Sequence, residues 1–511
     1  MSTKRSFNSL PLLPGEGWGE GESPKRNAPS PCPLPGGEGS AIVRHIDRRE
    51  MLRRAGCGFG LLAATDLLRA PRRAVAAAVR SANPLAPVAR DFAPRARSCI
   101  FLYMPGGPSQ IDLLDPKPEV TRHHGKPLPI EKPKLMHSKT TDLFGSLWKF
   151  DRHGESGIEL SRLLPHIASQ ADELCVIRSM VADNINHTGA ALQMNTGEQA
   201  FSRPSLGSWV TYGLGSESDS LPGFVVIAPQ PPFQGAPLWS SSFLPATYQG
   251  TWIQNLDQPI SDLPSQPNDL AWQRRKLDAL NQLNQEHLQL RPFENELEAR
   301  IASFELAFRM QMEAPEAFDL SQETSSTKVQ YGLGDPPTEV FGRQCLLARR
   351  LVERGVRFVQ VYDTGRGDST NTWDHHGGIP KGLPDRCLGI DRPVAGLIAD
   401  LKQRGLLDET LVVWGGEFGR TPTLEGADGR GHHPFGFTMF LAGGGVKGGY
   451  VHGATDDFGW WAVKDKVHVH DLHATILYLM GIDHERLTYR FGGRDYRLTD
   501  VYGNVVREIL A

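Results

Sequence analysis

Histidine, aspartate, glutamate and arginine gather with glycine in three short runs of the C-terminal half. The runs are Trp373–Gly378 (WDHHGG), Gly415–Pro422 (GGEFGRTP) and Gly429–Pro434 (GRGHHP). Imidazole and carboxylate groups are the ligands that zinc, manganese and iron take in proteins, so the runs predict a divalent-metal site. Arg420 and Arg430 could hold a phosphate or sulfate beside it. The alternative is structural: His375 and His433 as surface neighbours, and Glu417 with Arg420 as a plain salt bridge.

Two further polar clusters follow predicted strands. In Met104–Asp112, the glycines allow the backbone to approach a ligand, Ser109 offers a hydroxyl group and Asp112 a hard oxygen, although a capped turn has the same composition. In Asn184–Ala190, Thr188 or His187 would stand at a helix N-terminus, which suits a nucleophile that approaches an anion. An N-cap by Asn186 or Thr188 is the alternative.

A last group, His468–His473 (HVHDLH), precedes an amphipathic stretch. We expect Asp471 to be the N-cap of a helix over 472–480 rather than a metal ligand.

The elements that must position these residues alternate between buried strands and amphipathic helices. Strands are predicted at 98–104, 174–177, 356–362 and 410–414, with helices at 339–353 and 394–404 before the last two. This alternation predicts an α/β fold, with helices on both faces of the sheet. The loops after 362 and 414 should meet at one sheet edge. Residues 269–312 read as helical, a predicted insertion at about 265–320.

Composition limits the classes of protein to consider. Hydrophobic residues make up 39% of the 511 residues, with 54 glycines, which excludes wholesale disorder. The net charge of -3 provides no positive electrostatic field that would attract a polyanion, so we expect no nucleic-acid partner. The six cysteines form no close pairs; after removal of a signal, one disulfide among the last four is conceivable, and its pairing stays open.

The N-terminal region predicts export. Residues 1–42 form a Pro/Gly-rich leader, which we interpret as disordered and as the product of a misassigned start. Residues 43–78 combine a paired arginine, Arg48 and Arg49, with a short apolar stretch and small residues, as in a twin-arginine signal. That stretch is too short and polar for a stable membrane span. We therefore expect the twin-arginine machinery as a partner, a periplasmic or otherwise extracytoplasmic location, a linker at 79–95 and one domain at 96–511.

Several segments together resemble a bacterial family known as domain of unknown function 1501, whose members usually carry twin-arginine signals and are grouped with the alkaline-phosphatase and sulfatase superfamily. The matching segments are Gly106–Asp112, Trp373–His376, Arg404–Val413, Gly416–Pro422 and Gly453–Asp456. The resemblance implies an alkaline-phosphatase-like sandwich with a mixed, mostly parallel sheet. It also implies that Asp374 and His376 are a ligand pair, that Glu417 stands where the superfamily has an aspartate followed by histidine, and that His432 is a late histidine ligand.

The chain also departs from that superfamily. Gly106 and Gly107 stand where an acidic ligand is usual, Phe418 replaces the histidine after the acid, and the sulfatase Cys-x-Pro-x-Arg run is absent. We expect an exported metal-dependent hydrolase of phosphate or sulfate esters. Its metal (zinc, manganese, calcium or iron) would be held by Asp374, His376, Glu417, His432 and Asp112. Thr188 or His187 would act with Arg420 in catalysis, and Ser109 and Arg430 would bind the anion. The alternative is a non-catalytic exported binding or structural protein with the same fold.

Overall fold

A computed structural model of the protein describes residues 84–131, 142–259, 268–290, 295–364 and 372–511. The leader and the twin-arginine-like segment lie outside these ranges. Among the described residues, no helix combines the length and the apolar character needed to cross a membrane. The four described cysteines, Cys99, Cys175, Cys345 and Cys387, are buried, and no disulfide joins any two of them.

The centre of the fold is a mixed sheet in the order β12-β4-β11-β8-β1-β7-β5-β6, with β15 beside β4. All pairs are parallel except those of β11 with β4 and β8. The predicted mixed, mostly parallel sheet is confirmed. The strands are β12 (Tyr450–His452), β4 (Leu174–Val181), β11 (Phe437–Ala442), β8 (Thr410–Gly415), β1 (Ser98–Tyr103), β7 (Phe358–Tyr362), β5 (Phe224–Ile227), β6 (Thr251–Ile253) and β15 (Val467–His468).

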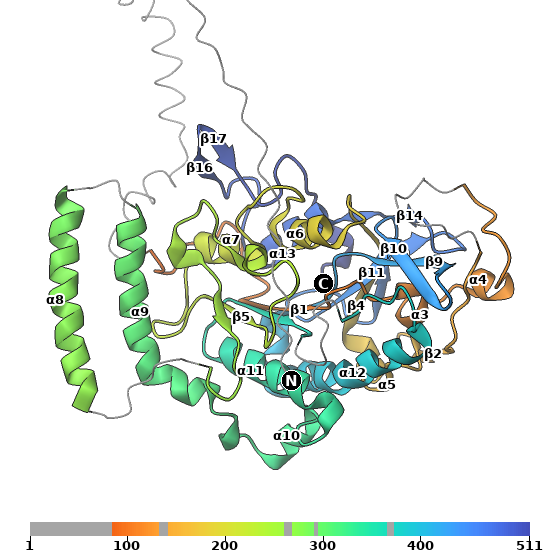
Figure 1. The fold of residues 1–511 in the computed structure, drawn as a ribbon, viewed down its shortest axis with the longest axis horizontal. Helices are drawn as coiled ribbons and strands as arrows, with labels where there is room; N and C mark the ends of the chain where they lie inside the picture. Colours follow the sequence, from red (N-terminus) through yellow and green to blue (C-terminus); the bar gives the residue numbers. More distant parts are fainter. Residues whose placement is uncertain (1–83, 132–141, 260–267, 291–294, 365–371) are drawn as a thin grey trace, which may run out of the picture. The chain divides into compact units, whose positions relative to one another are not determined.

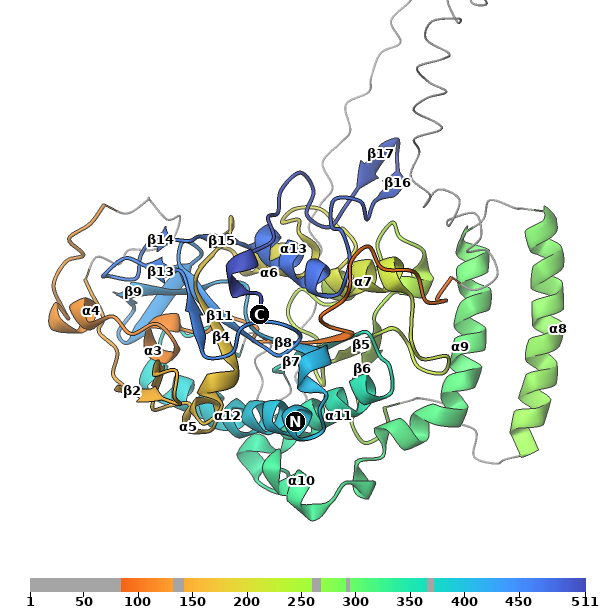
Figure 2. The ribbon, with the colours of Figure 1, turned by 180° about the vertical axis from the view of Figure 1, so that it is seen from behind.

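Helices cover both faces of this sheet, as predicted (Figures 1 and 2). The alternation of side chains along β1 explains why: Ile100 and Leu102 join one apolar core, while Phe101 and Tyr103 join the other. The first core includes α5 (Pro165–Ala168), α11 (Pro336–Glu353) and α12 (Ile379–Gln403); the second includes α6 (His187–Thr196), α7 (Leu206–Leu214) and α13 (Val469–Leu479).

Small hairpins and helices complete the body. The hairpins pair β2 (Phe150–His153) with β3 (Ile158–Ser161), β9 (Gly419–Glu425) with β10 (Gly429–His433), β13 (Ala454–Thr455) with β14 (Ala462–Lys464), and β16 (Tyr489–Phe491) with β17 (Arg494–Tyr496). The short helices are α3 (Gln110–Leu113), α4 (Pro118–Arg122) and α10 (Ser325–Gln330). Part of the expected linker packs against this body, because Val88 N–H donates to Leu214 O (2.9 Å) and Asp91 N–H to Gly481 O (2.8 Å).

Two long helices occupy the segment predicted to be helical. They are α8 (Asn268–Leu290) and α9 (Asn295–Phe318), and they pack against each other through Leu277 and an ion pair of Arg274 with Glu305 (2.8 Å).

Helix α13 begins one turn earlier than predicted. Its N-cap is His468, whose side chain accepts from the N–H of His470, while Asp471 at the third helical position accepts from the N–H of His468 (2.9 Å). The prediction of Asp471 as the N-cap residue was therefore wrong, because this reciprocal capping places the acid inside the first turn.

The buried His473 of α13 should make stability fall in acid. Burial lowers the pKa of His473 to about 3, while its Nε2 lies 2.8 Å from Met194 O. Because the unfolded imidazole takes up a proton near pH 6.5 and the folded one does not until about pH 3, acid favours unfolding in that window. We expect the free energy of unfolding of His473→Gln to change less steeply with pH. Between pH 6 and pH 4 its slope should be smaller than that of the wild type by up to about 1.4 kcal/mol per pH unit. Urea titrations at several pH values measure this; equal slopes in both proteins would contradict it.

Candidate metal site

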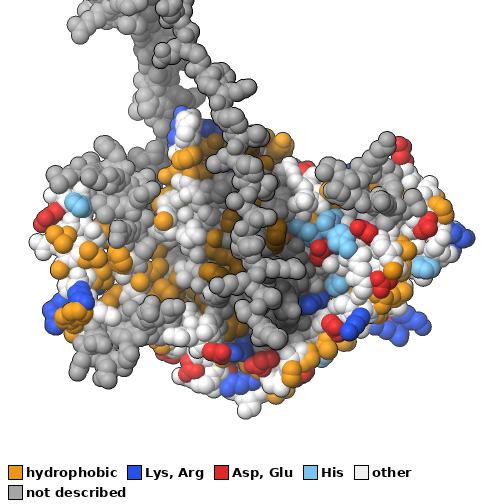
Figure 3. All heavy atoms as spheres, viewed as in Figure 1, with side chains coloured by type: hydrophobic (Ala, Val, Ile, Leu, Met, Phe, Trp, Pro, Cys, Tyr) orange, Lys and Arg blue, Asp and Glu red, His pale blue; other side chains and the backbone are white. Residues whose placement is uncertain are grey.

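Four side chains present their ligand atoms to one another at the carboxyl edge of the sheet. They are His187, Asp374, His376 and His432, and one atom from each lies within 4.8 Å of all the others. The strands β1, β7 and β8 are parallel neighbours, and β4 runs in the same direction across the antiparallel β11. Loops that follow these strands therefore meet at one edge. Figure 3 shows imidazole and carboxylate side chains together on the face beside β10 and α6.

Asp374 occupies the centre of this group. Its Oδ1 lies 3.0 Å from Nε2 of His376 and 3.4 Å from Nε2 of His432, and its Oδ2 lies 3.2 Å from Nε2 of His187. Burial favours the neutral acid, but the three imidazoles and Arg420 outweigh it and hold the pKa of Asp374 below its usual value. The carboxylate is therefore an anion that faces three nitrogen atoms.

Each imidazole is anchored through its other ring nitrogen. The Nδ1 atoms lie 2.6 Å from Glu417 Oε1 for His187, 3.0 Å from Glu425 Oε1 for His376, and 2.7 Å from Ile185 O for His432. A proton on each Nδ1 would leave the lone pair on Nε2, which is how metal-binding histidines are oriented in proteins. The tautomers follow from these oxygen partners.

The three inward Nε2 atoms share the single carboxylate of Asp374 as their neighbour. Nε2 of His376 lies 2.8 Å from Nε2 of His432, so the two lone pairs would face each other. Nε2 of His187 is buried without a well-aligned hydrogen bond in the described part of the chain. A cation among these atoms satisfies all three nitrogens, so the residues fit a metal ion.

Burial and nearby charges shift the pKa values of His187 and His432 in opposite directions. Burial lowers the pKa of His432 to about 4, despite Asp374. Burial also opposes protonation of His187, but Asp374 and Glu417 outweigh it and raise its pKa to about 9, so at neutral pH a metal ion at its Nε2 would replace a proton. His376 is the exposed member, with 42% of its side chain accessible, so the site opens to solvent on that side. An open side is needed for a substrate to reach a metal.

Glu417 lies behind His187 and outside the four-residue group. Its buried carboxylate accepts from Gly106 N–H (2.9 Å) and from the Tyr103 hydroxyl (3.0 Å), besides its contact with Nδ1 of His187. Burial opposes ionisation, but His187 outweighs it and lowers the pKa of Glu417. Glu417, a sequence candidate for metal ligation, thus contacts His187 of the four-residue group and is not itself a member of that group.

Arg420 is fully buried on β9, and each of its nitrogens already has an acceptor. Nε donates to Gly107 O (3.0 Å), Nη1 to Arg430 O (3.1 Å), and Nη2 to Asp374 Oδ1 (2.6 Å) and Gly106 O. The side chain is therefore placed to hold Asp374, not to bind an external anion. Arg420 forms its ion pair with Asp374, so the salt bridge with Glu417 that the sequence offered as an alternative is not formed.

The two residues expected to bind an anion, Ser109 and Arg430, both contact the buried carboxylate of Asp112 instead. Arg430 donates to both oxygens of Asp112 (Nε 2.8 Å, Nη2 3.1 Å), and Ser109 Oγ donates to the same carboxylate (2.6 Å). All three residues are buried, and Asp112 is not in the four-residue group. These contacts stabilise the junction of α3 with the β9–β10 hairpin.

The remaining sequence candidates lie around this centre. Thr188 follows His187 in α6, is exposed, and donates its backbone N–H to the Asn186 side chain (2.9 Å), so Asn186 is the N-cap. His375 and His433 contact backbone carbonyls, at Trp373 (3.1 Å) and Trp460 (2.7 Å). His433 is buried rather than at the surface.

Two glycines make the close packing possible. A Cβ atom on Gly106, whose φ is 109°, would lie 2.5 Å from the backbone nitrogen of Asp374, and one on Gly429 would lie 2.0 Å from the backbone of His376. The loop that carries Asp374 and His376 therefore packs directly against the backbone of Gly106 and Gly429.

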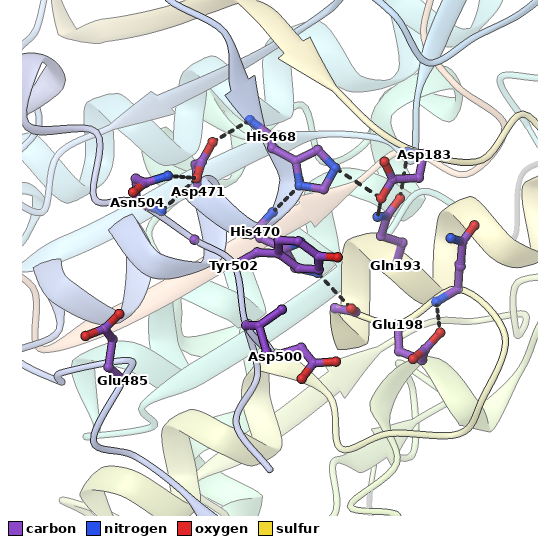
Figure 4. Close-up of a pocket in the computed structure, with 14 residues that line it drawn as sticks. Asp183, Gln193, Glu198, His468, His470, Asp471, Glu485, Asp500, Tyr502 and Asn504 are labelled. Atoms are coloured by element: carbon purple, nitrogen blue, oxygen red, sulfur yellow. Dashed lines mark hydrogen bonds and ion pairs between the residues drawn. The ribbon is translucent and has the colours of Figure 1, made fainter.

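A second polar cavity of about 950 Å³ lies between the end of α6 and the start of α13 (Figure 4). Its carboxylates are already bonded: Asp183 to His468 (3.1 Å), Glu198 to Arg203 (3.5 Å) and Asp471 to the backbone of Asn504 (2.7 Å). This arrangement stabilises the helix start and offers no comparable ligand set.

Sequence reasoning missed three contributors. Tyr103, Glu425 and the carbonyl of Ile185 support the ligands from behind, and no local pattern marks them because their partners are distant in the chain. His187 was singled out, but as a nucleophile. Its place directly after a strand that ends at the common edge was the signal for a ligand.

Residues 96–510 match the model of a family described as a protein of unknown function, DUF1501. No curated protein matches. Similar solved structures include the PsFucS1 sulfatase from Pseudoalteromonas sp. (13% identity, 76% of this chain and 69% of that chain, TM-score 0.33) and the lipoteichoic acid synthase LtaP from Listeria monocytogenes (8%, 79% and 78%, 0.34). A phosphonate monoester hydrolase from Silicibacter pomeroyi is a third (12%, 68% and 71%, 0.32). Similarity this distant says nothing about the chemistry of the site.

Proposed function

Because this chain belongs to the DUF1501 family, whose description names no reaction, we propose an activity from its own side chains: metal-dependent hydrolysis of phosphate or sulfate esters. The observation that supports it is the convergence of three anchored imidazoles and one carboxylate at a partly open site. We further propose that the protein acts outside the cytoplasm, which rests on the twin-arginine-like pattern of residues 43–78.

In this proposal His187, Asp374, His376 and His432 hold the ion. Three nitrogen ligands and one oxygen suit zinc, manganese or iron better than calcium, which prefers oxygen ligands alone. When bound there, a divalent cation would supply Lewis acidity that polarises the ester and makes a nearby water more acidic.

The surrounding residues would position the ligands and the substrate. Glu417 fixes the ring of His187, and Arg420 fixes the carboxylate of Asp374. Helix α6 begins at the cluster, so its positive end favours the negative charge of a phosphate or sulfate group. In one step, the oxygen of water would form a bond to phosphorus or sulfur while the ester bond breaks, and the leaving alcohol takes up the proton that the water gives up. In a two-step variant, the hydroxyl of the exposed Thr188 would attack first and pass its proton to the alcohol, and water would then cleave the Thr188 ester and restore the hydroxyl.

Metal analysis with an activity assay tests this function. We expect purified protein to contain about one zinc, manganese or iron per chain and to hydrolyse 4-nitrophenyl phosphate or sulfate. A chelator should abolish the activity, and the metal should restore it. Protein that neither contains nor takes up a stoichiometric metal would contradict the proposal and favour a non-catalytic binding protein.

Tyr103 offers a test that touches no ligand. In Tyr103→Phe, the buried Glu417 carboxylate loses a hydrogen-bond donor, so the ring of His187 is held less firmly. We expect metal affinity to fall about 10–100-fold, the usual effect of changing such supporting groups. Competition with a chelator measures it. Tyr362→Phe is the matched control, because that hydroxyl donates to Asn195 (3.3 Å) instead; equal losses in both variants would refute a specific role for Tyr103.

A further inference from the structure

Helix α8 carries an apolar stripe that its partner helix leaves exposed. Trp272, Leu280 and Leu283 are 51%, 38% and 61% exposed, whereas Leu277, on the face toward α9, is 9% exposed. Trp272, Lys276, Ala279 and Leu283 follow one another at spacings of four, three and four residues. This spacing keeps them on one side of a helix, as in the seam of a coiled coil. Among the described elements, α8 packs mainly against α9.

The charges along α8 would be complementary between two antiparallel copies of this helix. Arg275 and Lys276 lie toward its start, with Lys276 Nζ 3.0 Å from the centre of the Trp272 ring, and Glu286 lies toward its end. Figure 3 shows basic side chains at the lower end of this face, apolar ones along it and an acidic one at the upper end. Asn281 is midway between Lys276 and Glu286, and the two leucines flank it.

From this pattern we propose that α8 pairs with α8 of a second copy of the chain, antiparallel and around a twofold axis near Asn281. The leucines of both copies then meet at the centre, and each Lys276 faces the other copy's Glu286. An isologous contact needs one surface that complements itself, and α8 has this property. The opposed helix dipoles add a small favourable term.

The contact is small, so the dimer should be a weak one. A pair of helices buries less than the roughly 1,200–2,000 Å² of standard interfaces, and interfaces of this small size are typical of transient association. The pairing does not depend on the metal site, because it uses only residues of α8.

Sedimentation equilibrium of the full chain over a range of concentrations tests the pairing. We expect reversible dimers that Leu283→Glu weakens at least tenfold, whereas Gln285→Glu, at an exposed position on the opposite side of the helix, leaves them unchanged. Circular dichroism checks that the variants are folded. A monomer at all concentrations up to about 100 μM, or equal dimerisation of wild type and Leu283→Glu, would overturn the proposal.

Charge exchange tests the antiparallel arrangement. Lys276→Glu and Glu286→Lys should each weaken the dimer several-fold, and the double variant should recover most of the loss, because the exchanged charges attract again. Failure of the double variant to recover would exclude this register.

Discussion

Asp374→Asn is expected to abolish ester hydrolysis and to reduce metal affinity by more than about a hundredfold, since altering a supporting group alone costs 10–100-fold. The replacement keeps the shape of the side chain but removes the charge that faces three imidazoles and Arg420. Metal content of the purified variant and its rate with 4-nitrophenyl esters measure both effects.

The matched control is Asp183→Asn. Asp183 is also a carboxylate beside an imidazole, 3.1 Å from Nε2 of His468, but it lies in the separate cavity. We expect its variant to keep metal and activity. If Asp374→Asn retained full metal content, the assigned ligand set would be wrong even if the activity were lost.

The second large effect concerns stability. In Asp112→Asn the guanidinium of Arg430, which is fully buried, would lose its countercharge. Breaking one side of a buried ion pair costs about 3–5 kcal/mol. We expect the free energy of unfolding, measured in urea, to fall by about that amount.

Two comparisons isolate the cause of that loss. Asp151→Asn removes the acid of an exposed pair with Arg162 and should change stability little. Replacing both members of the buried pair, Asp112→Leu with Arg430→Met, should recover much of the loss, because no charge is then left without a partner. A loss in Asp112→Asn no greater than in Asp151→Asn would show that Arg430 does not depend on Asp112.

Structural features that depend on residues close together in the sequence can be predicted from it, whereas features that depend on distant contacts cannot. The strands that end at Tyr103 and Gly415 are continuous apolar runs, so their burial and the α/β class could be read locally. The start of α13 could not, because His468 and Asp471 are both able to cap a helix and only the folded backbone selects between them.

In the candidate metal site, too, the residue types were predictable but their long-range partners were not. The residue types predicted a metal and named Asp374, His376 and His432, which the structure brings together with His187. The partners of Arg420 and Arg430 could not be predicted, because a guanidinium close in sequence to candidate metal-binding residues can contact either a substrate or a neighbouring carboxylate. The partners Asp374 for Arg420 and Asp112 for Arg430 are 46 and 318 positions away, and no spacing rule predicts such pairs.

The anchoring of His432 to the carbonyl of Ile185 joins positions that are 247 residues apart. During synthesis at about 5–20 residues per second, the ribosome needs on the order of 10–50 s to reach the second partner after making the first. A nascent chain therefore lacks the complete four-residue group until β10 (Gly429–His433) has been made. If the group binds a metal as proposed, the ion can meet all four side chains only late in translation or after it.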